Sequence, residues 1–203
     1  MTQEMLSEIE NQTWPKQGEW TYQDYLNLPD DGRRYEIIEG VLYVTNAPNI
    51  DHQFTVMKTA ARLDQFVTEH ELGFVLTAPF EIHLSETTRP VLPDVILFIA
   101  KDRWPGPGAA YFEGAPDLIV EVLSPSTSRT DRAMDRVIKF EAYEQAGVRE
   151  YWIANPKTRS VEVFVLSSGE YALLNEFVGE EEVTSSVLAG LKVGVNVLFN
   201  PVK

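Results

Sequence analysis

Apolar residues return at helical spacing in two long segments of the chain. Over residues 52–70 they recur at three- and four-residue steps, which predicts an amphipathic helix with Gly73 as its stop. A second helix is predicted from Ser128 to about Gln145, because Ser128 and the acid three residues later resemble a capping box, and Gly147 would end it. A short helix is predicted within residues 20–28.

Shorter apolar segments predict the strands. Residues 95–99 and 117–123 are nearly continuous apolar runs, as in strands buried on both faces, and two shorter segments flank Glu39-Gly40 as in a hairpin. The two segments of this hairpin are residues 34–38 and 41–45. Further strands are expected at 74–77, 80–84, 150–154, 160–166, 170–176, 183–186 and 191–195, and a Gly/Pro-rich loop at 102–114. This order predicts an α/β (α+β) domain in which helices flank a mixed central sheet.

Length and composition limit the class of protein. The 203 residues predict one domain over residues 20–203, preceded by a loose polar arm over residues 1–19. The absence of cysteine excludes thiol nucleophiles, iron–sulfur clusters and Cys-based zinc sites. The longest apolar runs are too short to span a bilayer, and the acidic N-terminus lacks the apolar region of a secretory signal. We therefore expect a cytoplasmic protein that does not act at a membrane.

The net charge of −14, from 31 acids and 17 bases, argues at first against a nucleic-acid partner. The charge is unevenly distributed, however, because residues 129–159 hold five acids and seven bases, a local net charge of +2. This block is either the mixed surface of a solvated helix or a face that meets phosphates. The sequence leaves both interpretations open.

Two carboxylates stand where apolar residues are expected. Glu121 interrupts an apolar strand, and Asp94 directly precedes another. A buried ionised carboxylate is costly unless it is paired or bound to a metal. Glu121 could form a structural salt bridge, and Asp94 could simply end a turn. Taken together, the two side chains could converge on one Mg²⁺ ion, which prefers oxygen ligands and can activate water for phosphodiester hydrolysis.

Three more side chains are candidates for the same site. Lys139 lies on the predicted helix that follows Glu121, and either assists chemistry there or forms an exposed pair with Asp135. Glu36 also has apolar neighbours, and is either a fourth site residue or a solvent-facing residue of a half-buried strand. His52 opens a predicted helix as a cap-region residue, a phosphate contact or neither.

Four segments carry a more specific pattern. They read RYEIIEG at 34–40, PDV at 93–95, PDLIVEVLSPS at 116–126 and KFEAYEQAGVREYW at 139–152. In these segments the chain resembles the PD-(D/E)XK nuclease superfamily and, more narrowly, the Uma-two family of restriction endonucleases. The resemblance covers roughly residues 20–165, and the last two segments together are its most specific part.

The resemblance implies a restriction-endonuclease-like core. It also implies that Asp94 and Glu121 ligate Mg²⁺, that Lys139 assists the chemistry and that Glu36 lies nearby. One departure is that the superfamily places its lysine two residues after the acid, where this chain has Leu123. The family pattern places a lysine on the following helix instead, and Lys139 matches that position.

Three functions remain open at this stage. The first is a Mg²⁺-dependent endodeoxyribonuclease, with Mn²⁺ as a substitute and with Arg129, Arg132 and Arg136 as phosphate contacts on DNA. The second is a nuclease-fold protein without catalysis that serves in binding or assembly, for example as a homodimer that joins two basic faces. The third is a phosphohydrolase of small nucleotides, which no GxxxxGK or GxGxxG phosphate loop supports.

Overall fold

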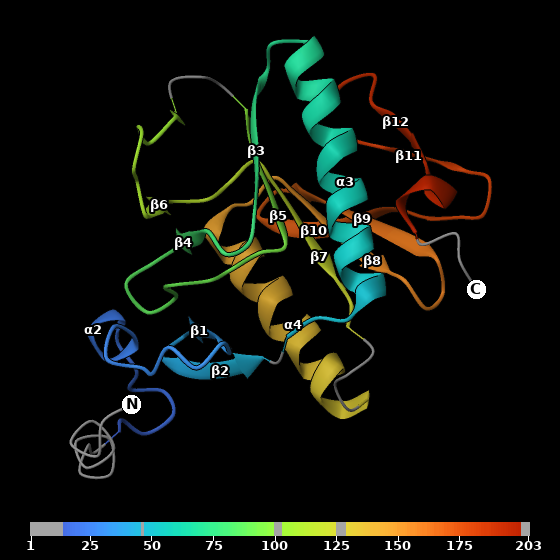
Figure 1. Ribbon diagram of the computed structural model, residues 1–203. Coiled ribbons are helices and arrows are strands. Elements are labelled where there is room, and N and C mark those ends of the chain that lie inside the picture. The colour runs from blue at the N-terminus through green and yellow to red at the C-terminus, as the bar shows by residue number, and fades with distance from the viewer. Residues whose placement is uncertain (1–13, 46, 100–102, 125–128, 200–203) are drawn as a thin grey trace.

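A six-stranded mixed sheet lies at the centre of the computed structural model (Figure 1). The structure describes residues 14–45, 47–99, 103–124 and 129–199, without the side chains of residues 129–135. The strand order is β10-β9-β8-β7-β5-β3, and β7 and β8 are parallel while the other neighbours are antiparallel. The strands are β3 (Gly73–Thr77), β5 (Val95–Ile99), β7 (Leu118–Val122), β8 (Glu150–Asn155), β9 (Ser160–Ser167) and β10 (Glu170–Val178).

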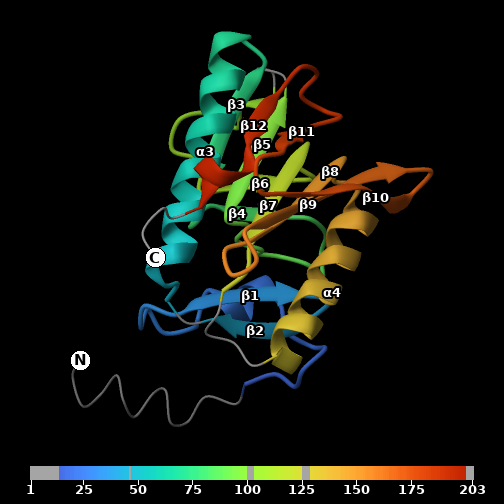
Figure 2. The ribbon, with the colours of Figure 1, turned by 90° about the vertical axis from the view of Figure 1, so that its right-hand side faces the viewer.

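Two long helices cover opposite faces of this sheet (Figure 2). Side chains of α3 (Ile50–Glu69) pack on one face and those of α4 (Arg129–Ala146) on the other. Successive residues of β5 alternate between the two faces, and both faces are buried, which explains the unbroken apolar run at 95–99. The predicted α/β (α+β) class and the mixed central sheet are confirmed.

Small paired elements surround the sheet. The hairpin of β1 (Arg34–Ile38) and β2 (Val41–Thr45) has the predicted bounds and forms a separate two-stranded sheet. Its turn contains Gly40, where a Cβ would lie 2.5 Å from the carbonyl oxygen of Gly18, so that no larger residue fits. The other small elements are α2 (Tyr22–Tyr25), β4 (Glu81–His83), β6 (Tyr111–Glu113), β11 (Glu182–Thr184), β12 (Lys192–Gly194) and the 3₁₀ helix η2 (Val195–Leu198).

The two long helices end in different ways. Helix α4 ends as predicted at Gly147, which has a φ of 84°, while its predicted cap, Ser128, lies outside the described residues. The prediction that Gly73 stops α3 is wrong, because the left-handed residue after α3 is Glu71, with a φ of 53°. Gly73 instead opens β3, where a Cβ would lie 1.9 Å from the carbonyl oxygen of Phe98. Close approach of two strands, and not a helix end, requires glycine there.

Two other differences concern the segments expected to be irregular. The predicted loop at 102–114 contains β6, which pairs in parallel with β4 and is too short to show a periodic pattern. Of the predicted N-terminal arm, residues 1–13 lie outside the described part. Within residues 14–19, Trp14 stacks on Trp20, and the Gly18 amide donates to the carbonyl of Gly40 in the hairpin. Among the described residues, no helix is both long and apolar enough to cross a membrane.

Candidate active site

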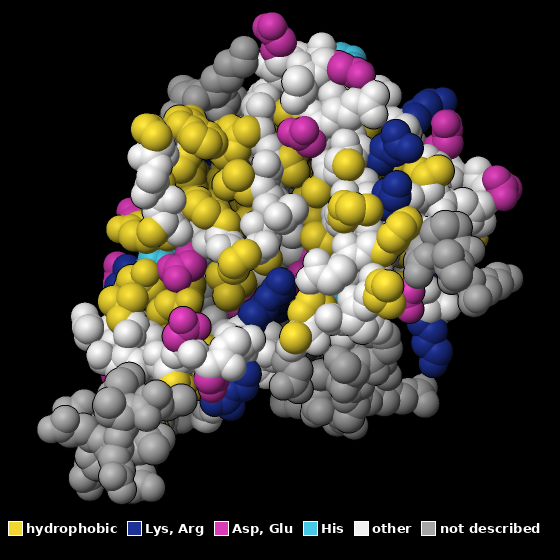
Figure 3. All heavy atoms as spheres, in the orientation of Figure 1, with side chains coloured by type: hydrophobic (Ala, Val, Ile, Leu, Met, Phe, Trp, Pro, Cys, Tyr) yellow, Lys and Arg dark blue, Asp and Glu magenta, His cyan; other side chains and the backbone are white. Residues whose placement is uncertain are grey.

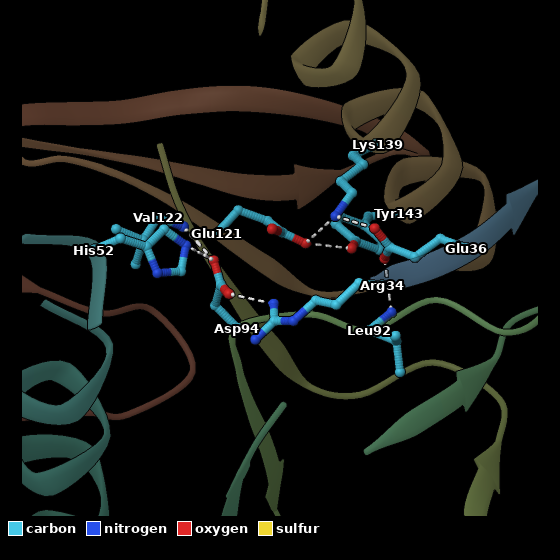
Figure 4. Close-up of polar contacts among 9 residues, drawn as sticks. All are labelled: Arg34, Glu36, His52, Leu92, Asp94, Glu121, Val122, Lys139 and Tyr143. Carbon is cyan, nitrogen blue, oxygen red and sulfur yellow. Dashed lines mark hydrogen bonds and ion pairs between the residues drawn. The ribbon is translucent and has the colours of Figure 1, made fainter. Parts of the chain in front are cut away.

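The end of the central sheet brings Asp94 and Glu121 to the same place. The antiparallel register pairs Val95 of β5 with Val120 of β7, so one further step along both strands sets Asp94 opposite Glu121. The two acids thus stand side by side at this end of the sheet, with Asp94 contacting His52 of α3 on one face and Glu121 contacting Lys139 of α4 on the other. The two predicted metal ligands therefore share one edge, and Figure 4 shows them among seven neighbouring side chains and amides.

Glu121 receives two donors from α4. The ammonium Nζ of Lys139 lies 3.1 Å from Glu121 Oε1, and the hydroxyl of Tyr143 donates to the same oxygen at 2.6 Å. Lys139 and Tyr143 are four residues apart and thus one turn apart on the same helix face. Both of these contacts fall on Oε1 of Glu121 and not on Oε2.

Lys139 joins Glu121 to the hairpin. Its Nζ also lies 3.1 Å from Oε2 of Glu36, whose Oε1 accepts a 2.7 Å hydrogen bond from the amide of Leu92. Only 8% of the Lys139 side chain and 4% of the Glu36 side chain are exposed. This burial excludes the alternatives of an exposed lysine and of a solvent-facing glutamate. The structure brings Glu36, Glu121 and Lys139 together in one buried ion-pair cluster.

Asp94 is held by three donors from other parts of the chain. Its Oδ2 accepts from the Val122 amide at 2.9 Å and lies 3.0 Å from Nε2 of His52, and its Oδ1 lies 3.3 Å from Arg34. His52 stands in the first turn of α3, where the Asn49 side chain caps its amide. Because an ionised carboxylate can only accept, Nε2 of His52 carries the proton in this contact.

The surroundings push the pKa values of the two acids apart. Burial disfavours the charge of Asp94, but the hydrogen bond and charge of His52, with the Val122 amide and Lys139, hold its pKa below the usual range. Burial, with the charges of Asp94 and Glu36, raises the pKa of Glu121 to about 8 despite Lys139 and Tyr143. Burial beside Glu121 also raises the pKa of Tyr143. Glu121, which holds a proton near neutral pH, is therefore a neighbour of Asp94, which is ionised there.

The carboxylate oxygens of this site suit a hard cation that also binds water or phosphate oxygens. In the described part of the chain, no three His, Asp or Glu side chains are grouped closely enough to hold a metal ion by themselves. Mg²⁺ commonly takes one or two carboxylates and completes its shell with water and substrate phosphate. Among the described residues, Asp94 Oδ1 has the long 3.3 Å contact with Arg34, and the two contacts of Glu121 with α4 fall on Oε1, so Asp94 Oδ1 and Glu121 Oε2 are the oxygens best suited to such a cation.

The predicted phosphate contacts lie on the N-terminal half of α4. The side chains of Arg129 and Arg132 are outside the described residues. Arg136 donates at 2.7 Å to Glu162 of β9. Their contact with DNA stays a prediction.

Sequence reasoning did not assign Arg34 or Tyr143 to the site, and it left His52 undecided. Tyr143 follows Lys139 by four residues, which puts both on one face of the predicted helix, and that spacing was a usable signal. Arg34 and His52 are 60 and 42 residues from Asp94 in sequence, so no local pattern connects them to it.

Comparisons with known proteins concern the family and the fold. The sequence model of the Uma2 family, described as "Putative restriction endonuclease", matches residues 22–197. Among solved structures, a putative nuclease belonging to DUF820 from Anabaena variabilis ATCC 29413 has a TM-score of 0.71 and 21% sequence identity, over 88% of this chain and 97% of that chain. At this identity the likeness shows a shared fold. No curated protein matches the sequence.

Proposed function

Because the chain belongs to the Uma2 family of restriction-endonuclease-like proteins, we propose that it is a metal-dependent endodeoxyribonuclease of the PD-(D/E)XK type, which hydrolyses phosphodiesters of DNA. The observation that carries the proposal is the cluster of Glu36, Glu121 and Lys139 beside Asp94. The acids that can bind a cation are buried there next to a fixed positive charge, the Lys139 ammonium.

Asp94 and Glu121 are the residues that would hold Mg²⁺, or Mn²⁺ in its place. Such an ion supplies charge neutralisation at a phosphoryl oxygen and lowers the pKa of water. In the proposal, water attacks the phosphorus in line with the leaving oxygen, and the Lys139 ammonium stabilises the negative charge that develops on the phosphoryl oxygens. Glu36 holds Lys139 in place and Tyr143 fixes the orientation of Glu121, each through the contact described above.

The position of Lys139 compensates for Leu123 at the usual place of the lysine. A lysine two residues after Glu121 would extend from β7 itself, whereas Lys139 extends from α4. The 3.1 Å contact between Lys139 Nζ and Glu121 Oε1 supports the assignment, because it puts the ammonium at the acid with which the superfamily pairs its lysine. The reach of Lys139 is thus what the departure from the motif requires.

The surface charge suggests how DNA would be bound. On the face in Figure 3, Lys and Arg side chains lie scattered among acidic and apolar ones and form no continuous basic surface. We therefore propose that DNA meets the N-terminal half of α4, with Arg129, Arg132 and Arg136 as phosphate contacts, and we expect weak, salt-sensitive and metal-dependent binding in the cytoplasm. A homodimer that joins two such faces would enlarge the basic surface that meets DNA, although each chain has a net charge of −14.

Plasmid cleavage tests the proposed activity. Supercoiled DNA is incubated with Mg²⁺ or Mn²⁺ and with wild type, Asp94→Ala, Glu121→Ala or the control Glu182→Ala, an exposed acid paired with Lys192. Wild type and the control should nick or linearise the plasmid, and both site variants should not. Cleavage that persists in both site variants would overturn the assignment.

A second candidate is a binding or assembly module without catalysis. One observation favours it: Asp94 already has three donors and Glu121 has two, so the cluster is compensated without any ligand. Absence of cleavage of supercoiled, linear and single-stranded DNA by wild type, together with retained binding, would select this candidate.

A further inference from the structure

Arg34 makes the longest polar contact of the candidate site. Its guanidinium lies 3.3 Å from Asp94 Oδ1, whereas the other two donors of Asp94 lie at 2.9 and 3.0 Å. Its side chain is 27% exposed, compared with 6% for His52. Of the three donors to Asp94, Arg34 is therefore the one that can move away from the carboxylate with the least loss of packing.

The space into which Arg34 can turn is also present. Arg34 borders a pocket of about 290 Å³ between α3 and the end of β3, and Gln53 and Thr77 are among the other residues that line it. Arg34 lines this pocket and also contacts Asp94, so rotation about the bonds of its long side chain can carry the guanidinium from the carboxylate toward the pocket. A guanidinium in such a partly open place is suited to bind a phosphate with two parallel hydrogen bonds.

Arg34 and a metal ion would require the same oxygen. The Val122 amide and His52 occupy Asp94 Oδ2 from one side, which leaves Oδ1 as the oxygen for a further positive group. Arg34 holds this oxygen in the structure. Two positive charges on one oxygen repel each other strongly at low effective dielectric, so a cation that binds Asp94 displaces Arg34.

We propose that Arg34 is a phosphate-binding residue that exchanges between Asp94 and DNA: it occupies Asp94 in the free protein, and moves to a DNA phosphate when a divalent cation binds. The inference rests on the proposed function and identifies a contact with its substrate. It makes the binding of metal and of DNA cooperative, because the metal releases the guanidinium that DNA needs. By linkage, DNA then strengthens the binding of the metal by the same factor.

The test uses Arg34→Gln and two binding measurements that need no cleavage. The dissociation constant for Mn²⁺ is measured by calorimetry on the free protein, and that for a short fluorescent duplex by anisotropy with and without Ca²⁺ as a non-cleaving ion. Removal of the competing guanidinium should strengthen Mn²⁺ binding by severalfold. It should also weaken duplex binding in Ca²⁺ by about tenfold, the size of one charge-assisted hydrogen bond, and remove most of the effect of Ca²⁺ on duplex binding.

Two further variants separate these effects from a change in folding. Arg103→Gln is the matched control, because Arg103 is 31% exposed and pairs at 2.7 Å with another buried acid, Asp117, outside the cluster. It should leave Mn²⁺ and duplex binding unchanged. Arg34→Lys keeps one positive charge without the two-pronged geometry, so Mn²⁺ binding should stay near wild type while duplex binding in Ca²⁺ falls. This variant decides the question if Arg34→Gln does not fold.

Opposite shifts in the two affinities support the exchange. Unchanged or weaker Mn²⁺ binding in Arg34→Gln would overturn it and would make Arg34 a support of Asp94, and so would unchanged duplex binding. A wild type that binds no Mn²⁺ would overturn it as well. If wild type cleaves no plasmid while the affinities still shift in opposite directions, the endonuclease proposal fails and the exchange stands.

Discussion

The ion pair between Lys139 and Glu36 connects α4 to a hairpin that is not part of the central sheet, with the two charged atoms 3.1 Å apart and both side chains buried. Buried pairs of this kind give little net stability, since desolvation offsets most of the attraction. Their removal on one side is nevertheless costly, because the other charge stays buried. The pair therefore serves to position Lys139 more than to stabilise the fold.

Substitution Lys139→Met should abolish most of the cleavage. It removes the positive charge next to Glu121 while it keeps the length of the buried side chain. We expect the rate of cleavage at saturating DNA to fall by about 10²–10³-fold, the usual loss for one electrostatic donor, while duplex affinity in Ca²⁺ stays within about twofold of wild type. Lys192→Met is the control, because Lys192 is exposed and pairs with Glu182. A rate within a few-fold of wild type would remove Lys139 from the chemistry.

Substitution Glu36→Gln should separate position from charge. Glutamine can still accept the hydrogen bond from the Leu92 amide, but it no longer pairs with the Lys139 ammonium. We expect a lower cleavage rate with an unchanged KM for DNA, and a free energy of unfolding lowered by roughly 1–3 kcal/mol in urea titrations. Glu19→Gln, at an exposed acid before the hairpin, should change neither. A raised KM with an unchanged rate would mean that Glu36 acts on substrate binding.

The affinity for Mn²⁺ should rise with pH. Because the pKa of Glu121 is raised to about 8, this side chain is mostly protonated below that pH and must lose its proton to ligate a cation. The association constant should therefore increase up to about tenfold per pH unit below pH 8 and level off above it, with release of about one proton per ion. Calorimetry in two buffers of different ionisation enthalpy measures that proton. In Glu121→Gln the pH dependence should disappear, and a flat profile in wild type would contradict the assignment of the proton to Glu121.

Glu150 is a buried acid that should matter for stability alone. It is fully buried; Oε1 accepts from the Trp152 indole, and Oε2 from the hydroxyl and amide of Ser186 and from the Val187 amide. Glu150→Ala leaves these donors without a partner and should lower the free energy of unfolding by about 3 kcal/mol or more. The Mn²⁺ affinity of the folded fraction should equal that of wild type. A large loss of Mn²⁺ affinity would show that the sheet transmits the change to the site.

Local patterns predicted most elements of the fold, and the exceptions have a tertiary cause. The steps of apolar residues in α3 and the run at 95–99 reflect burial against the sheet, which a sequence displays directly. The strand β6 forms because three residues meet β4 from a distant loop. Gly73 resembled a helix stop, whereas its role depends on the carbonyl of Phe98, 25 residues away.

The same distinction applies to the site. Glu121 and Asp94 were identifiable because a charge in an apolar segment is unusual wherever it occurs. The side-chain partners of Asp94 were not, because Arg34 and His52 reach it from the hairpin and from α3. Periodicity describes one element at a time and contains no information on which elements meet.

The attachment of the hairpin can also be followed by hydrogen exchange. Leu92 lies two residues before Asp94, and its amide donates to Glu36. The amide of Ile37 donates to the carbonyl of Pro90 at 3.0 Å. The Leu92 amide can exchange its hydrogen with solvent when Glu36 releases it, so its exchange rate reports how often the hairpin separates from the segment that leads into Asp94. Deuterium uptake by a peptide over residues 90–94 would thus time this opening without any added label.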